Sequence, residues 1–565
     1  MTEKTIWQVW SENTEKAPDS DAIIHWKAGE EPFRWKKSEL LETAAKFSAL
    51  LKRNGIKRDQ VCAIIIRHHH LFYPLYMGIV GLGAIPAVLA YPNPRLHPDK
   101  FRQGIIGMSQ RSGLDFIFTE KELEPIISPL IKSSTIKGLH YPMEWDLNQE
   151  IPSAEMDELT AARAEINPAD PILLQHSSGT TGLQKPVLLS HSAVIQHVEY
   201  YSKSIELGEA DKIVSWLPLY HDMGLIAAFH LPLTFGIPTI QIDPFEWVIA
   251  PVLQLEAITA EKATICWLPN FAYNLMADKI FDDELESVNL ASLRQVINCS
   301  EPVRAESHRR FIERFVPYGL NSTALATCYA MAETTFAVTQ SKPGEAPKQV
   351  YADREMLKQG KLKLIDDPSQ ARICVSSGHV IEGCGVKIVG DNREELSSDS
   401  FGEIAISSVS MFDGYRNYPE KTAEVLSDGW YYSGDYGFMK DGECYVIGRK
   451  KDIIIVAGKN IYPEDVEDTV SKVEGVLPGR VIAFGIDDEA LGTEVVCVIA
   501  ESNITDEKEK KELRMRILQA TLANDETVGR VYIVPPRWLI KSSAGKPSRK
   551  ANRERIDEQK EFLVV

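Results

Sequence analysis

From residue 61 onward, short runs of apolar and β-branched residues alternate with stretches whose apolar positions repeat at helical spacing. Strands joined through helices pair in parallel, because a crossover helix returns the chain to the same end of the sheet. The pattern therefore predicts an α/β fold in which helices cover parallel sheets. The predicted strands of this part are Val61–Arg67, Asp115–Thr119, Leu173–His176, Ile213–Leu217, Thr239–Ile242, Thr264–Leu268 and Gln295–Cys299.

The pattern changes after about residue 335, where strands become shorter and turns such as Asp428–Gly429 and Asp441–Gly442 become frequent. We expect a smaller, more antiparallel and barrel-like part here. Past Lys451 the α/β alternation returns, so the chain divides into a large N-terminal domain, residues 1–450, and a small α/β domain, residues 451–565. The predicted elements of the small domain are strands Ile453–Val456, Arg480–Gly485, Glu494–Ala500 and Val531–Val534, and helices from Pro463 and from Asp506.

One uncharged run, from Tyr73 to Pro92, is about long enough to cross a bilayer. Prolines and glycines interrupt it, and it divides into a helix at Leu75–Leu82 and a buried strand at Ile85–Leu89. We interpret it as core and expect no integral membrane segment. The preceding His68–His69–His70 could hold a metal ion, but three consecutive side chains cannot all face one ion, which favours a polar strand end.

Composition narrows the function classes. The 565 residues are 44% hydrophobic and 25% charged, so the chain is globular and too long for one compact core. A formal net charge of −18 disfavours nucleic acid as the main partner, although a local basic patch could hold ATP. The scattered cysteines form no C-x-x-C pair, and the first residues lack the regions of a signal peptide. Both features predict a cytoplasmic protein.

A hydroxyl- and glycine-rich loop is the strongest chemical feature: Ser177–Ser178–Gly179–Thr180–Thr181–Gly182–Leu183–Gln184–Lys185. It follows an apolar run and precedes an amphipathic stretch that starts near His191, so we expect strand, loop and helix in succession. Glycines let the backbone approach a ligand closely, while N–H groups, hydroxyls and a lysine donate to phosphate oxygens. The glycine spacing and the proline after Lys185 exclude a Walker A loop. A flexible surface loop is the plain alternative.

This loop and several later stretches resemble the motifs of the adenylate-forming superfamily, which includes acyl-CoA synthetases, luciferases, nonribosomal peptide adenylation domains and fatty acyl-AMP ligases. The resemblance covers about residues 170 to 550. It implies an enzyme that uses ATP and Mg²⁺ to join a carboxylic acid to AMP, with a mobile C-terminal domain. The matching stretches are Trp216–Leu225, Asn298–Pro302, Tyr329–Thr335, Asp428–Asp435 with Gly448–Asp452, and Lys541–Lys546.

The resemblance assigns nucleotide and metal contacts to these stretches. An aromatic residue at the position of Tyr329 stacks on adenine, and a carboxylate at the position of Glu333 holds Mg²⁺, which prefers hard oxygen ligands. Taken alone, Glu333 could equally complement a helix dipole. The other implied contacts are Ser300, Glu301, Pro302 and Ala330 beside the adenine, Thr334 at the α-phosphate, and Thr180 at the metal.

Five further positions have implied roles. Asp435 matches the ribose-binding aspartate, whose carboxylate can accept from both vicinal hydroxyls. Arg449 accompanies it, and Lys451 occupies the hinge between the domains. Lys546 matches the catalytic lysine, and His221 lies at the gate of the acyl pocket unless it is a satisfied core histidine. Without the family, these stretches indicate only a hairpin turn and a solvated basic loop.

One departure from the family lies in the phosphate loop, which usually runs Pro-Lys-Gly and here runs Gln184–Lys185–Pro186. The proline stiffens the backbone and removes one N–H. The departure puts the usual contact of Lys185 with the β- and γ-phosphates in doubt.

The stretches Trp216–Leu225 and Gly458–Glu467 look closest to fatty acyl-AMP ligases. An extra segment near Tyr351–Leu364 is similar to the insertion that restrains the C-terminal domain of those ligases and disfavours CoA. We therefore expect a fatty acid substrate and an acyl carrier protein as acceptor. An acyl-CoA synthetase stays open as the alternative. A catalytically silent nucleotide-binding homologue is less favoured, because such a chain has no reason to keep Glu333, Asp435, Arg449 and Lys546 together.

Overall fold

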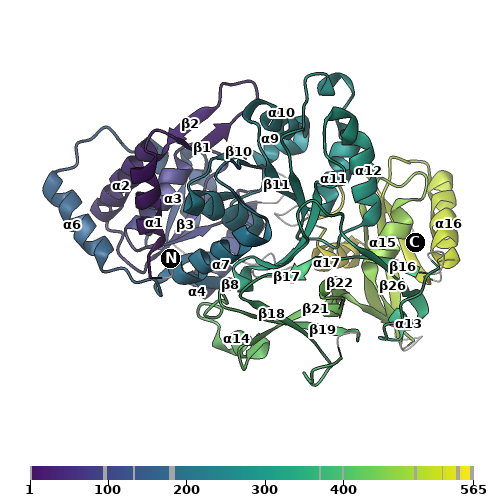
Figure 1. The fold of residues 1–565 in the computed structure, drawn as a ribbon. Helices are drawn as coiled ribbons and strands as arrows, with labels where there is room; N and C mark the ends of the chain where they lie inside the picture. The colour runs from purple at the N-terminus through teal and green to yellow at the C-terminus, as the bar shows by residue number, and fades with distance from the viewer. Residues whose placement is uncertain are drawn as a thin grey trace.

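A computed structural model describes residues 3–92, 98–131, 134–176, 185–367, 371–397, 400–457, 459–488, 493–524, 526–541 and 547–559. In Figure 1 the C-terminal part, in yellow and light green, lies at one end of the molecule beside α12 (Ala305–Phe315). An ion pair of 2.8 Å between Arg304 and Asp468 joins the two parts there. No helix within the described ranges has both the length and the apolar composition to cross a bilayer.

One long mixed sheet forms the centre of the N-terminal part, in the order β18-β19-β21-β22-β17-β14-β13-β12-β11-β9-β10-β1-β2, with β20 beside β21. Strands from β13 to β1 pair in parallel, so their carboxyl ends lie along one edge. Antiparallel pairing begins between β13 and β14, which confirms the predicted change near residue 335. The bounds are β1 (Asp21–Trp26), β2 (Phe33–Lys36), β9 (Ile213–Ser215), β10 (Thr239–Ile242), β11 (Ile265–Leu268), β12 (Gln295–Asn298), β13 (Leu325–Ala330), β14 (Ala337–Gln340), β17 (His379–Val380), β18 (Cys384–Val389), β19 (Gly402–Ser408), β20 (Leu426–Ser427), β21 (Trp430–Lys440) and β22 (Glu443–Arg449).

A second sheet, in the order β4-β3-β5-β6, is parallel throughout. The uncharged run after Tyr73 forms a core helix and a core strand, as predicted. Gly78 packs so closely on α2 that an added Cβ would lie 2.8 Å from the Ala44 carbonyl oxygen. The bounds are β3 (Val61–Ile65), β4 (Ile85–Val88), β5 (Leu114–Thr119) and β6 (Gly138–His140), with α1 (Ile6–Lys16), α2 (Lys37–Arg53), α3 (Phe72–Gly81), α4 (Pro98–Ser112), α5 (Glu124–Ile131) and α6 (Ser153–Ala164) nearby in the chain.

The expected order of strand, phosphate loop and helix is wrong in one respect. A second strand, β8 (Pro186–Ser190), pairs antiparallel with β7 (Pro171–His176), so the loop connects a hairpin. The apolar residues after Pro186 bury themselves against β7, and helix α7 (His191–Ser204) starts only where Ser190 caps it. Residues 177–184 of the loop lie outside the described residues.

The C-terminal part has the predicted small α/β pattern. Its sheet β25-β26-β27 carries apolar clusters on both faces, and helices α15 and α16 begin at or one residue from the predicted positions. Arg549 binds three carboxylates, those of Asp452, Glu464 and Glu467, within 3.0 Å. The bounds are β23 (Ile454–Val456), β24 (Lys459–Ile461), β25 (Val481–Asp488), β26 (Thr493–Glu501), β27 (Val528–Val534), α15 (Pro463–Ser471), α16 (Glu507–Ala523) and α17 (Arg549–Gln559).

The histidines after β3 pack against β1. The rings of His25 and His68 stack 3.9 Å apart, and His25 Nδ1 lies 3.0 Å from the Tyr73 hydroxyl. Burial lowers the pKa of His25 to about 2 and the pKa of His68 and His69 to about 4. Among the described residues, no group of three or more His, Cys, Asp or Glu side chains is arranged to hold a metal ion.

We predict that acid destabilises the protein partly through His25. Its pKa lies below the usual 6.5 in the folded chain, so below pH 6.5 the unfolded chain binds a proton that the folded chain does not. This lowers the free energy of unfolding by up to about 1.4 kcal/mol per pH unit. Urea unfolding between pH 7 and 4.5 should show that the free energy of unfolding falls less per pH unit for His25→Gln than for the wild type. Equal slopes for the variant and the wild type would contradict the assignment.

Candidate active site

The segment expected beside adenine follows β12 at the carboxyl edge of the large sheet. Ser300 has φ +71°, a left-handed conformation that non-glycine residues adopt rarely and that clusters at functional sites. Its hydroxyl lies 3.7 Å from Met223 Sδ. The Glu301 carboxylate accepts from the backbone N–H of Phe271 at 2.9 Å, so its position is fixed by the start of α11 (Asn270–Lys279). Pro302 continues this turn.

Tyr329, Asp435 and Arg449 form one connected set. The Tyr329 hydroxyl donates to Asp435 at 2.6 Å, and Arg449 Nε lies 3.4 Å from the other carboxylate oxygen. Asp435 and Arg449 are partners in the register of β21 and β22. The Asp435 carboxylate raises the pKa of Arg449, which stays charged. An ionised carboxylate has about four acceptor positions, so Asp435 can still accept from a ligand's hydroxyls.

Glu333 is buried in a single 3-10 turn (Ala332–Thr334) that follows β13. Its carboxylate accepts from the Tyr415 hydroxyl at 2.6 Å, and Lys185 Nζ donates to the same hydroxyl at 3.1 Å. Burial lowers the pKa of Lys185, and Glu333 opposes that effect. Lys185 therefore shares the Tyr415 hydroxyl with Glu333, the carboxylate expected to hold Mg²⁺.

Thr334 does not face this space. Its hydroxyl lies 3.2 Å from the Met331 carbonyl oxygen and 3.1 Å from that of Phe336, and the residue has no exposed surface. The expected contact of Thr334 with the α-phosphate stays a prediction; in the structure its hydroxyl holds the turn that carries Glu333. Ala330 lies at the end of β13 and half faces solvent.

The acyl-gate motif begins just after β9. His221 Nδ1 lies 2.7 Å from the Asp222 carboxylate, and the π-helical segment Met223–His230 starts immediately afterwards. Gly224 is required here, because a Cβ would lie 2.4 Å from the Pro218 carbonyl oxygen. The contact of Met223 with Ser300 brings this motif beside the adenine segment. The gate role of His221 stays a prediction.

The remaining predicted residues are Lys451, the phosphate loop and Lys546. Lys451 lies two residues after Arg449, at the exit from β22. The phosphate-loop residues Ser177, Ser178, Gly179, Thr180, Thr181 and Gly182, and the catalytic candidate Lys546, lie outside the described residues. Their roles stay predictions.

Tyr415 is the site residue that sequence reasoning missed. The Asp413–Gly414 pair before it indicated only a turn, and Tyr415 lies 82 residues from Glu333 along the chain. A long-range contact of this kind leaves no local spacing pattern. Only an aromatic hydroxyl immediately after that turn could have suggested it.

Known proteins are similar to this chain in sequence and in fold. The profile of the family described as AMP-binding enzyme matches residues 10–416, and the chain belongs to this family of adenylate-forming enzymes. It is 31% identical over 504 residues to the medium-chain-fatty-acid--[acyl-carrier-protein] ligase JamA of Moorena producens (strain JHB), covering 86% of this chain and 82% of that protein. It is 27% identical to the long-chain-fatty-acid--AMP ligase FadD26 of Mycobacterium tuberculosis (strain ATCC 25618 / H37Rv), covering 98% and 97%. Among solved structures, the fatty acyl-adenylate ligase from L. pneumophila in complex with acyl adenylate and pyrophosphate matches with a TM-score of 0.73 and 26% identity, covering 98% and 96%.

We predict that Tyr329→Phe weakens ATP binding about tenfold, because a hydrogen bond to a charged group is lost while the ring stays. The lost bond should matter most for the ribose. Calorimetric titration should therefore show a smaller preference for ATP over 2′-deoxy-ATP in the variant. Tyr432→Phe, on β21 with Asp435, is the control. An unchanged preference in Tyr329→Phe would mean that Asp435 needs no support from Tyr329.

Proposed function

We propose that the protein activates a fatty acid with ATP, giving fatty acyl-AMP and pyrophosphate, and passes the acyl group to the phosphopantetheine thiol of an acyl carrier protein. The observation that carries the proposal is that Glu333, Asp435 and Arg449, which come from distant segments, each lie in a hydrogen-bonded or ion-paired group. Asp435 accepts a hydrogen bond from Tyr329 at 2.6 Å. Glu333, four residues after Tyr329 in the chain, accepts a hydrogen bond from Tyr415 at 2.6 Å. The names of the relatives support the fatty acid and the carrier protein.

In the first step a carboxylate oxygen attacks the α-phosphorus, and the bond to pyrophosphate breaks. Charge builds on the phosphate oxygens, so catalysis depends on positioning and on electrostatic stabilisation. Asp435 suits the ribose hydroxyls and the Tyr329 ring suits the adenine. Mg²⁺, when bound, neutralises phosphate charge, and the buried Glu333 carboxylate is the hard ligand it prefers. In the second step the carrier thiol attacks the acyl carbon and AMP leaves.

The proposal also needs groups that bind the phosphates and the metal. Lys185 supplies positive charge beside Glu333. The residues proposed to supply hydroxyls, metal ligation or the second ammonium are Ser177, Ser178, Thr180, Thr181 and Lys546.

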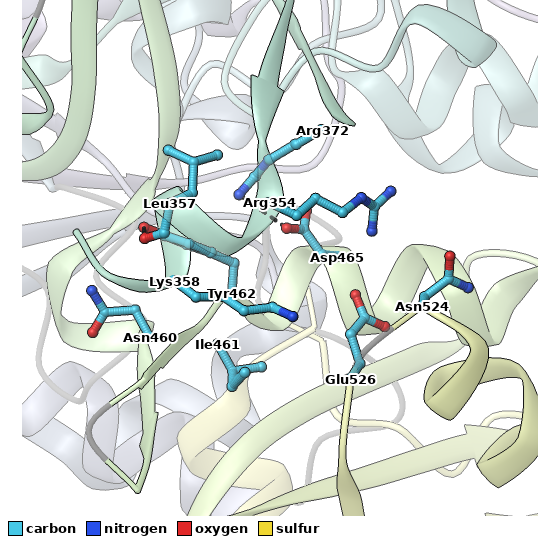
Figure 2. A pocket seen from close by; sticks show the side chains of 10 residues that line it. All are labelled: Arg354, Leu357, Lys358, Arg372, Asn460, Ile461, Tyr462, Asp465, Asn524 and Glu526. Carbon is cyan, nitrogen blue, oxygen red and sulfur yellow. Dashed lines mark hydrogen bonds and ion pairs between the residues drawn. The ribbon is translucent and has the colours of Figure 1, made fainter. Parts of the chain in front are cut away.

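We further propose a domain boundary at Lys451, between residues 1–450 and 451–565. The extra segment faces the small domain across this boundary. Figure 2 shows residues of both parts lining the pocket between the extra segment and the small domain. Arg372 lies 3.1 Å from Asp465, and the Tyr462 hydroxyl donates to the Leu357 carbonyl oxygen at 3.2 Å. These contacts support a restrained small domain and hence a carrier protein over free CoA. The predicted extra segment near Tyr351–Leu364 lies within residues 349–375, whose elements are β15 (Gln349–Asp353), α13 (Arg354–Lys358) and β16 (Ala371–Val375).

We predict ATP- and acid-dependent pyrophosphate release with medium- or long-chain fatty acids. The product should move to holo carrier protein faster than to free CoA. Coupled pyrophosphate detection and mass spectrometry of the carrier test both steps, with apo carrier protein as the control because it lacks the thiol.

Two outcomes would change the proposal. Equal transfer to CoA and holo carrier protein would favour the acyl-CoA synthetase alternative. ATP binding with no pyrophosphate release with any fatty acid would favour the silent, nucleotide-binding homologue.

We predict opposite defects for two variants of the small domain. Lys546→Ala should slow adenylation about 10³-fold, a loss typical of removing a charge-stabilising group, yet still transfer acyl groups from supplied acyl-AMP. Lys451→Pro should keep much of adenylation and lose transfer, because a fixed φ blocks rotation at the hinge. Single-turnover assays of each half-reaction separate the two effects. Equal loss of both half-reactions in both variants would refute an alternating domain.

A further inference from the structure

We infer that Tyr415 is a positioning residue for adenylation: its hydroxyl holds the Glu333 carboxylate and the Lys185 ammonium in place and keeps these two opposite charges apart. The inference rests on the proposed function, in which Glu333 faces Mg²⁺ and Lys185 faces phosphate.

The direction of both hydrogen bonds follows from the groups involved. An ionised carboxylate only accepts, and an ammonium only donates, whereas a phenol does both. The Tyr415 hydroxyl therefore donates its one proton to Glu333 at 2.6 Å and accepts from Lys185 at 3.1 Å. Lys185 Nζ also lies 4.9 Å above the Tyr415 ring, which favours a cation.

The backbone around Tyr415 connects the same two parts of the site. The Phe412 N–H donates to the Glu333 carbonyl oxygen at 2.9 Å, and the Arg416 N–H donates to the Pro186 carbonyl oxygen at 2.9 Å. Tyr415 also bridges to Val187 on β8, the strand directly after the phosphate loop. The ring is 3% exposed and packs on Phe412 with a centroid distance of 4.9 Å. The hydroxyl is therefore fixed relative to both the turn of Glu333 and the end of the loop.

Loss of this hydroxyl would remove the partner that the buried carboxylate and the partly buried ammonium share. The two opposite charges would then attract each other into a direct ion pair, because charges attract strongly where water is largely excluded. Such a pair would withdraw Glu333 from the metal and Lys185 from the phosphates. The defect should therefore depend on the metal, whereas a merely structural role of Tyr415 would weaken ATP binding with or without metal.

The test is calorimetric binding of ATP, with and without Mg²⁺ and with no acid present, to wild type, Tyr415→Phe and the control Tyr418→Phe. We expect the gain in ATP affinity caused by Mg²⁺ to fall about tenfold or more in Tyr415→Phe, while metal-free binding changes little. Tyr418→Phe should match the wild type. The Mg²⁺ concentration for half-maximal pyrophosphate release should rise in parallel.

An unchanged Mg²⁺-dependent gain, or an equal loss with and without metal, would overturn the inference. If Tyr415→Phe does not fold by circular dichroism, Lys185→Met tests the same arrangement. ATP should then bind more weakly by about the same factor with and without Mg²⁺, because Glu333 keeps its hydrogen bond from Tyr415. A loss of the Mg²⁺-dependent gain in Lys185→Met would overturn the inference. A wild type that binds MgATP but releases no pyrophosphate with any fatty acid would refute the proposed function and leave the binding comparison interpretable.

Discussion

The hydrogen bond from Tyr329 to Asp435 joins the two halves of the large sheet at the place where the site is built. Tyr329 ends the last strand that pairs in parallel with its predecessor, and Asp435 belongs to the antiparallel half. Parallel strands present their carboxyl ends along one edge, which is where α/β sheets bind ligands. The antiparallel hairpin β21–β22 supplies what those ends lack, a carboxylate and a guanidinium in fixed register. A change of pairing at β13 is therefore a condition of the site and not an incidental feature of the fold.

A second layer holds the turn of Glu333 from behind. His197 Nε2 accepts from the backbone N–H of Ala337 at 3.0 Å, so its Nδ1 carries the proton and donates to the Ser410 hydroxyl at 3.1 Å. Burial lowers the pKa of His197 to about 3, which keeps the ring neutral and this arrangement intact at physiological pH. Thr335 adopts φ +70° and donates to the Ser410 carbonyl oxygen at 2.8 Å. The turn that carries Glu333 is thus held by buried hydrogen bonds, which keep the Glu333 carboxylate in one orientation.

The parts of the fold that sequence predicted are those determined by local burial. Thr239–Ile242 and the neighbouring parallel strands are continuous apolar runs, and β10 has the predicted bounds. Strand β8 was missed because Pro186 at its start and the loop before it indicated irregular structure, while its burial against β7 is a tertiary effect. Motif matching named Glu333, Tyr329, Asp435 and Arg449 but gave no side-chain directions. It did not indicate, for example, that the Thr334 hydroxyl lies against two backbone carbonyl oxygens. Tyr415 was missed for the opposite reason, since its role exists only in three dimensions.

At the interface with the small domain, two arginines of the large domain form ion pairs with aspartates of α15. Arg304 pairs with Asp468, and both side chains keep about a third of their surface exposed, at 32% and 37%. A pair in that environment is worth at most about 1 kcal/mol. Arg372 is only 12% exposed where it meets Asp465. Asp465 is 26% exposed, so this pair is partly buried. Separating it costs more than separating the exposed pair of Arg304, because charges attract more strongly where water is largely excluded. If the small domain rotates about Lys451, the ion pair of Arg372 with Asp465 therefore supplies the larger part of the electrostatic resistance to that rotation. The ion pair of Arg304 with Asp468 can break and re-form with little effect on the rate of rotation.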